Sequence, residues 1–131
     1  MVTHQIRQYQ QTQVMTSSGV QIVVLLYDAA IQSIGLARAG IESNNIKDKG
    51  RFLGRAISII GELNSVLDFE RGGDIALQLH RLYEYILTEL VTANVRNSTR
   101  HLDGPLRCLI TLREGWREVA AQQQHTVGAA R

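Results

Sequence analysis

The chain has 131 residues, of which 44% are hydrophobic and 20% are charged, proportions typical of one soluble globular domain. The formal net charge is only +2 and acids are interleaved with the arginines, so charge gives no reason to expect nucleic acid or an anionic membrane as a partner. The single cysteine excludes an intrachain disulfide.

Residues 1–15 are rich in glutamine and poor in apolar residues, which predicts an N-terminal arm or a short helix. The N-cap residues TSSG follow at 16–19. From Val20 to Ile41 apolar residues recur with a helical period. A second apolar face on this segment is formed by Leu25, Ala29 and Leu36. We therefore expect a central helix that several neighbours bury.

Residues 42–50, ESNNIKDKG, are predicted to form a polar connection. The next helix is expected from about Arg51 to Asp68, and the glycine pair after it would end it, because glycine accepts the left-handed conformation of a C-cap. A third helix should begin at Asp74, with a turn at 94–99 after it.

The last helix is expected to run to about Ala121, and Pro105 predicts either a start around Asp103 or a small kink there. Four amphipathic helices with short connections predict an all-α fold, an antiparallel four-helix bundle. The expected organisation is an N-terminal arm (1–15), a bundle domain (16–121) and a flexible tail (122–131).

Residues for catalysis or metal binding are sparse. None of the four histidines has a second ligand at the spacing of E-x-x-H or H-x-x-x-H, and Cys108 lies on an apolar-leaning helix, which favours a buried thiol. Nucleophile-elbow and phosphate-loop motifs are missing from the sequence. We expect no enzyme activity, metal or cofactor; the rival class is an enzyme built on a four-helix bundle.

The longest apolar run, IVVLLY at 22–27, is far shorter than the ~20 residues that span a bilayer. No apolar leader precedes it, so we expect a cytoplasmic protein without membrane insertion.

The four helices have more apolar surface than a small bundle can bury, so we look to this surface for the function. A groove for a helical partner is therefore expected. Tyr83 and Tyr85 lie about 200° apart on a helix, so we predict Tyr83 inward and Tyr85 at the edge, available to a partner. The other candidate groove residues are Val24, Ile31, Leu53, Ile57, Ile60, Leu87 and Val91.

Two segments resemble the flagellar secretion chaperone family (FliS). The first, YQQTQVMTSSGVQIVVLLYDAAI at 9–31, is similar to an opening Y-x-x-x-Q-V-x-T followed by L-Y/F-D-G/A. The second, FERGGDIALQLHRLYEYI at 69–86, is similar to E-K-G-G-E-I-A-x-N-L-x-x-L-Y-x-Y. LTELVTANVRN and LREGWREV resemble the closing segments, although SGVQI at 18–22 replaces the usual S-P-x-E-L.

The resemblance implies a helical bundle that binds the C-terminal segment of flagellin in the cytoplasm and prevents premature polymerisation. It also implies delivery to the cytoplasmic domain of the flagellar export gate, with Ile6 and Tyr9 as candidates for gate docking. The alternative is a self-associating structural or adaptor bundle without a flagellin client. Whether the chain forms a homodimer stays open at this point.

Overall fold

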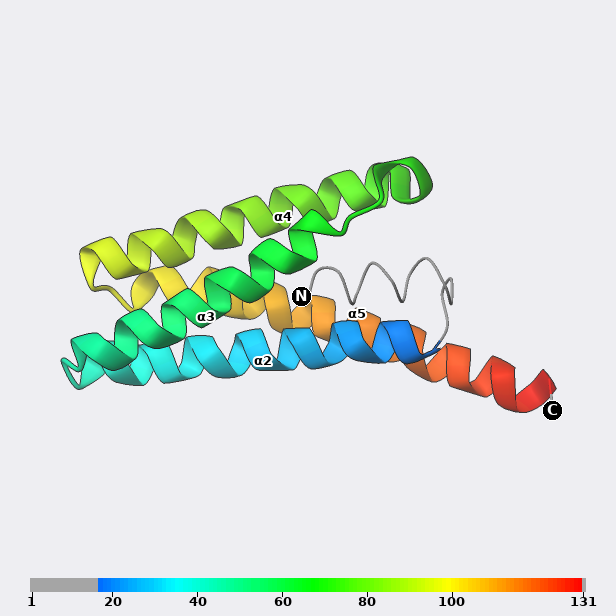
Figure 1. Cartoon of the computed structure of the whole chain (residues 1–131), viewed down its shortest axis with the longest axis horizontal. Coiled ribbons are helices and arrows are strands. Elements are labelled where there is room, and N and C mark those ends of the chain that lie inside the picture. The colour runs from blue at the N-terminus through cyan, green and yellow to red at the C-terminus, as the bar shows by residue number, and fades with distance from the viewer. Residues whose placement is uncertain (1–16, 131) are drawn as a thin grey trace.

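The computed structural model describes the backbone of residues 17–130 and the side chains of residues 19–123. This part of the chain forms four helices, α2 (Ser17–Glu42), α3 (Ile46–Ser65), α4 (Phe69–Arg96) and α5 (Arg100–Ala130) (Figure 1). Successive helices run in opposite directions, which confirms the all-α fold and the antiparallel four-helix bundle. The predicted arm, with Ile6 and Tyr9, lies outside the described residues.

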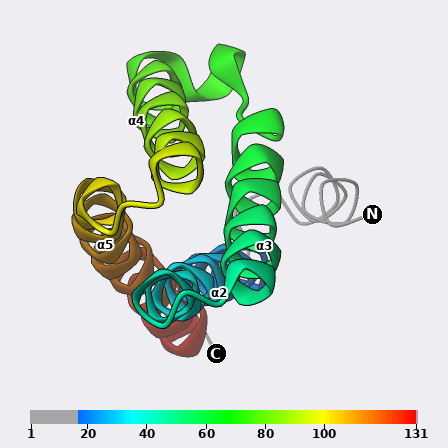
Figure 2. The same cartoon turned by 90° about the vertical axis from the view of Figure 1, so that its left-hand side faces the viewer.

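The helices form a closed ring of neighbours (Figure 2). α2 packs on α3 and α5, and α4 packs on the same two helices, so α2 and α4 occupy opposite corners. The contacts of α2 are the more extensive. The prediction that several neighbours bury this helix was wrong, because α2, like α4, packs on two helices and keeps one face exposed.

The core is filled by aliphatic and small side chains from all four helices, together with two tyrosines. Its buried members are Tyr27, Ala30, Ile34, Ala37, Ile41, Leu53, Ala56, Ile60, Leu63, Tyr83, Ile86, Leu90, Ala93, Leu102 and Leu109. Small residues on α2 let α3 approach closely: a Cβ built on Gly40 would lie 2.8 Å from the backbone nitrogen of Lys49. The position of Tyr83, 2% exposed, confirms that it points inward.

The connection between α2 and α3 is shorter than predicted. Only residues 43–45 separate the helices, because Asn45 caps α3 by accepting a hydrogen bond from the amide of Asp48 at 3.1 Å. The polar run at 42–50 therefore contains the first turn of α3 and not a long loop.

The predicted end of the second helix was wrong by three residues. α3 ends at Ser65, and Asp68 is the N-cap of α4, accepting from the amides of Glu70 and Arg71. The glycine pair then lies inside α4, where Gly73 has φ 50° and ψ −124° and kinks the helix. Glycine tolerates this backbone conformation because it has no Cβ.

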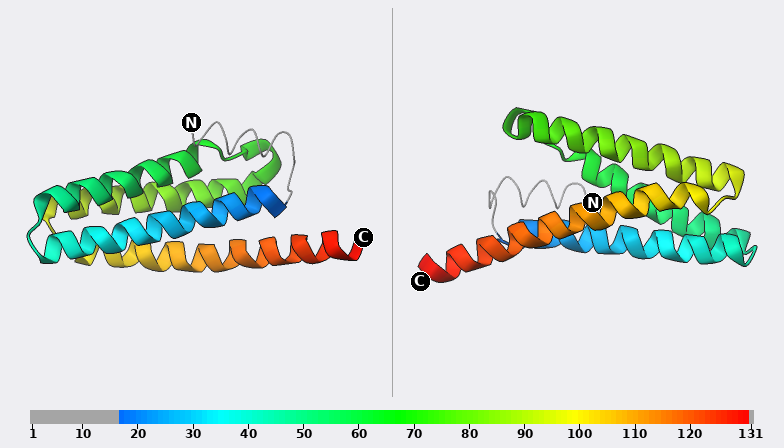
Figure 3. Two further views of the ribbon diagram at one scale, coloured as in Figure 1. Left: turned by 60° about the horizontal axis from the view of Figure 1, so that its bottom comes forward. Right: turned by 180° about the vertical axis from the view of Figure 1, so that it is seen from behind.

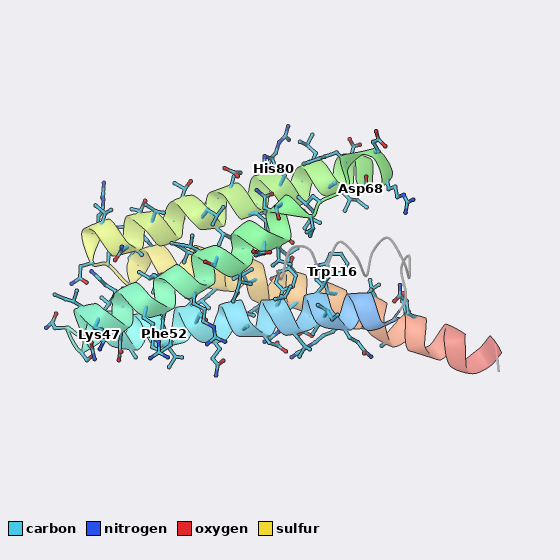
Figure 4. The ribbon with its side chains drawn as sticks, in the orientation of Figure 1. Lys47, Phe52, Asp68, His80 and Trp116 are labelled. Atoms are coloured by element: carbon cyan, nitrogen blue, oxygen red, sulfur yellow. The ribbon has the colours of Figure 1, made fainter. Side chains whose placement is uncertain are left out.

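The kink at Gly73 turns the residues before it back alongside the later turns of α4. The ring of Phe69 meets that of His80 edge-on, with centroids 5.8 Å apart, although the two residues are eleven positions apart in the chain. Asn64, in the last turn of α3, completes this corner by contacting His80 Nδ1 at 2.8 Å and donating to Glu84 Oε1 at 3.1 Å. Figure 4 shows His80 and Asp68 at this end of the bundle.

α5 begins three residues earlier than predicted and carries Pro105 inside it. It continues to Ala130, so the range predicted as a tail, 122–131, starts within a helix. Its last turns extend past the beginning of α2 (Figure 3).

One helix is long and apolar enough to cross a membrane by length and composition, the segment Gly19–Glu42. Its most apolar window has a mean hydropathy of 1.7, and only 33% of that window is buried. The core helix of a soluble bundle passes the same test, and α2 packs on two neighbours here. Its remaining exposed face still needs an explanation.

Candidate functional site

Three predicted groove residues meet between α3 and α4. Asn64 bonds Glu84 near one end of this helix pair, and Lys49 Nζ donates to the carbonyl of Asn94 at 3.3 Å near the other. Ile57 lies about halfway along α3 between these two contacts. Since α3 and α4 are antiparallel, the halfway point on α4 is the turn from Leu87 to Val91. Ile57 and Asn64 are two turns apart and so share a face of α3. We call Ile57, Leu87 and Val91 the α3–α4 strip.

The α3–α4 strip is apolar and only partly covered. Val91 is 50% exposed, while Ile57 and Leu87 are half-buried at the margin of the core. Three glycines of α3, Gly50, Gly54 and Gly61, fall on the same side of the helix as Ile57. A Cβ built on any of them would meet nothing within 4 Å. The strip is therefore bordered by bare helix backbone.

Val24 and Ile31 lie on a different side, where α2 meets α5. Ion pairs bracket Ile31: Asp28 with Arg113 at 3.1 Å and Arg38 with Asp103 at 2.6 Å. We call this contact line the α2–α5 seam. Val24 and Ile31 are half-buried there, so a partner touching them and the α3–α4 strip would have to pass around the bundle.

Two candidate groove residues were placed wrongly. Leu53 and Ile60 are 1% and 0% exposed and belong to the core. Both sit on the inward side of α3, which packs on α2 and α4, so no partner reaches them in this conformation. Core and groove positions share one helical period, and sequence alone did not separate them.

Tyr85 lies at the edge of α4, 44% exposed, and leans onto α5. Its hydroxyl oxygen is 1.9 Å from where a Cβ on Gly104 would be, so this contact depends on glycine at that position. Leu82, Arg107 and Cys108 line a shallow depression beside it. The prediction that Tyr85 contacts a partner remains a prediction.

One apolar surface was not recognised as a site from the sequence. Leu25 is 64% exposed and Leu36 is 39% exposed, although the second apolar face of this helix was expected to be buried. On the neighbouring helix α3, Phe52 and Ile59 are partly buried against the core, and Figure 4 labels Phe52. The signal was present in the spacing of Leu25, Ala29 and Leu36, but it was assigned to the core.

The most perturbed titratable groups are two core tyrosines. The hydroxyls of Tyr27 and Tyr83 hydrogen-bond to each other across the bundle, joining α2 and α4, which lie at opposite corners of the ring. Burial raises the pKa of both phenols above the ordinary 10.0, and hydrogen bonds from Tyr83 and Trp116 offset only part of the rise at Tyr27. Within the described residues, no group of three or more His, Cys, Asp or Glu side chains is placed to hold a metal.

Comparison with known proteins identifies the family of this chain. The family model described as flagellar protein FliS matches residues 2–123. A flagellar secretion chaperone FliSB from Pseudomonas aeruginosa is 40% identical over 114 residues, covering 84% of this chain and 90% of the relative. The FliS chaperone of Salmonella typhimurium is 34% identical over 82% of this chain and 80% of its own length. That of Vibrio cholerae is 30% identical, with 90% and 87% covered. The family match over nearly the whole length shows that the chain belongs to the flagellar protein FliS family.

Proposed function

We propose that this protein is a cytoplasmic, non-enzymatic export chaperone that binds the C-terminal segment of flagellin and prevents its premature polymerisation. Membership of the FliS family and relatives named as flagellar secretion chaperones support this function. Delivery to the cytoplasmic domain of the export gate, with Ile6 and Tyr9 as docking residues, belongs to the same proposal.

We assign part of the client-binding surface to the α3–α4 strip, and the half-exposed Val91 is the observation that carries this assignment. A client helix laid along the strip would use the spacing of its own apolar face to contact Ile57, Leu87 and Val91. This is a surface at which an added helix would continue the packing of the bundle.

The glycines beside the strip support a helical occupant. Each glycine inside a helix costs about 1 kcal/mol relative to alanine. Gly50, Gly54 and Gly61 have neither a left-handed backbone nor a neighbour that a Cβ would strike, so nothing in the described chain requires them. Bare backbone lets another helix approach closely, which would offset this cost in the complex.

The strip alone is too small to hold a client. A micromolar to nanomolar complex needs about −8 to −12 kcal/mol. A large apolar side chain contributes ~1.5–3 kcal/mol when it is fully buried, and ordering a flexible segment costs ~2–5 kcal/mol. Three half-covered residues fall short, so we expect the client to wrap around the bundle to reach Val24 and Ile31, or Tyr85.

Calorimetric titration of the flagellin C-terminal segment tests the assignment. The double variant Ile57→Asp with Val91→Asp should weaken binding by at least ~tenfold, since it places two carboxylates in an apolar contact. Ile75→Asp is the matched control, because Ile75 is 69% exposed at the start of α4, away from the strip.

Unchanged affinity in a folded double variant would remove the strip from the client surface. Binding with a heat-capacity change near zero would contradict extensive apolar burial altogether. Failure of the wild-type protein to bind flagellin would favour the alternative, an adaptor bundle without this client.

A further inference from the structure

A shallow pocket lies between α4 and α5, beside the ring of Tyr85. Its volume is about 370 Å³, at the lower end of the ~300–1,000 Å³ that ligand sites occupy. Such a space suits the last one or two residues of a chain better than a helix, whose diameter is ~10–12 Å. We call it the α4–α5 pocket. It combines the partly buried Leu82, Cys108 and Leu112 with the exposed Tyr85, Arg107 and Thr111.

The border of the α4–α5 pocket carries positive charge and free hydrogen-bond donors. Arg107 makes no ion pair or hydrogen bond within the part of the chain that the structure describes. Arg81, one turn before Tyr85 and on the same side of α4, is also exposed and unpaired there. The hydroxyls of Tyr85 and Thr111 have no hydrogen-bond partner among the same residues. The border therefore offers two guanidinium groups and two hydroxyl groups to a ligand.

Acids near the pocket are engaged with other residues. Glu89 Oε2 of α4 contacts His101 Nδ1 at 2.9 Å, and Asp103 of α5 pairs with Arg38 of α2. Neither carboxylate neutralises the arginines at the pocket border. A ligand with a negative charge next to an apolar side chain would match both the border and the leucines below it.

We propose that the α4–α5 pocket holds the C-terminal carboxylate of the flagellin client, whose neighbouring apolar side chain contacts Leu82 and Leu112. The inference rests on the proposed function, because a client bound through its C-terminal segment brings a chain end to the bundle. A terminal carboxylate is ionised at neutral pH, where arginine stays protonated. The guanidinium group of Arg107 can donate two parallel hydrogen bonds to such a carboxylate.

The pocket is within reach of a client that lies on the α3–α4 strip. Val91 and Tyr85 are six residues apart on α4, so their side chains point about 120° apart, on either side of the exposed Thr88. The path between them over the surface of α4 is ~15 Å long, and about four or five extended residues cover that distance. The proposal therefore selects Tyr85, and not the α2–α5 seam, as the client's next contact beyond the strip.

Calorimetric titration with two synthetic peptides of the flagellin C-terminal segment tests the proposal. One peptide ends in the natural carboxylate and the other ends in an amide. The full wild-type chain should bind the carboxylate form at least ~tenfold more tightly, because the amide loses the charge-assisted hydrogen bonds to arginine. The difference should shrink as salt is added, since exposed charges are screened.

Arg107→Gln should reduce the difference between the peptides to within ~twofold, by weakening the carboxylate form and not the amide. Arg55→Gln is the matched control, because Arg55 is an exposed arginine of α3 that is also unpaired among the described residues. It removes the same charge from the chain and should leave the difference intact. Circular dichroism of each variant confirms that the helices are retained.

Equal affinity of the two peptides for the wild-type chain overturns the inference while leaving the chaperone function in place. A difference that survives in a folded double variant, Arg81→Gln with Arg107→Gln, also overturns it. A folded Arg107→Gln variant that binds both peptides equally weakly would assign the pocket to an acidic side chain within the client, against the proposal. A wild-type chain that binds neither peptide contradicts the proposed function itself, and the inference fails with it.

Discussion

Removing one hydroxyl of the buried tyrosine pair should cost more than removing both. Tyr27 and Tyr83 are 0% and 2% exposed, and their hydroxyls bond to each other between helices that do not otherwise pack together. In Tyr27→Phe the hydroxyl of Tyr83 loses this partner where water does not reach. An unsatisfied buried polar group costs ~1–3 kcal/mol. Tyr83→Phe should cost less, because the hydroxyl of Tyr27 keeps its hydrogen bond from Trp116.

The double variant Tyr27→Phe with Tyr83→Phe removes both polar groups together. Replacing both partners of a hydrogen bond by apolar groups of the same shape is nearly neutral. We therefore expect a free energy of unfolding within about 1 kcal/mol of wild type, and a favourable coupling of at least ~1 kcal/mol between the two substitutions.

Urea unfolding followed by far-UV circular dichroism measures these differences, provided that the slope with denaturant stays the same across the four proteins. Tyr85→Phe is the control and should change stability by less than ~0.5 kcal/mol, because its hydroxyl lies at the surface. A double variant that loses the full sum of the two single losses would refute the reasoning. It would mean that each hydroxyl has an independent partner.

Three further outcomes are expected. Burial holds the pKa of Tyr27 and Tyr83 above 10.0, so the folded protein keeps both phenolic protons after the unfolded chain has lost them. Stability should therefore be full below pH 10 and fall above it by up to ~2.7 kcal/mol per pH unit, and the double phenylalanine variant should lack this loss in urea titrations at high pH. Gly104→Ala should lower the melting temperature of wild type but raise it in a Tyr85→Ala background, where the helix gains up to ~1 kcal/mol and nothing obstructs the Cβ. Gly73→Ala should cost ~1–3 kcal/mol by urea unfolding, because alanine is strained at φ 50° and ψ −124°; an unchanged midpoint would show that the kink relaxes.

The helices and most of their inward residues could be predicted because the helical period reports which positions share a face. Tyr83 was assigned inward on this basis, and the structure confirms it. Helix ends were harder. Asn45 and Asp68 look like loop residues in sequence, and only the hydrogen bonds of their side chains to following amides show that they begin helices.

The helical period of apolar residues could not show which of them lie in the core and which line a surface groove. Ile60 and Leu36 are both large aliphatic residues on amphipathic helices, yet one is completely buried and the other is 39% exposed. What separates them is how each helix is rotated against its neighbours. Contacts such as Asp28 with Arg113, between residues far apart in the chain, fix that rotation, and no local pattern records them.

The α2–α5 seam also fixes the order in which the molecule can be completed during synthesis. Asp28 and Arg113 are 85 positions apart, whereas the other helix pairs that touch are consecutive in the chain. A nascent chain that ends before Arg100 can assemble the first three helices but leaves one side of α2 and one side of α4 without a neighbour. Contacts between residues far apart in the chain form slowly, and apolar helix sides that are still exposed favour aggregation until those contacts form. The final helix, α5, must therefore leave the ribosome before the aggregation-prone intermediate can become a complete bundle.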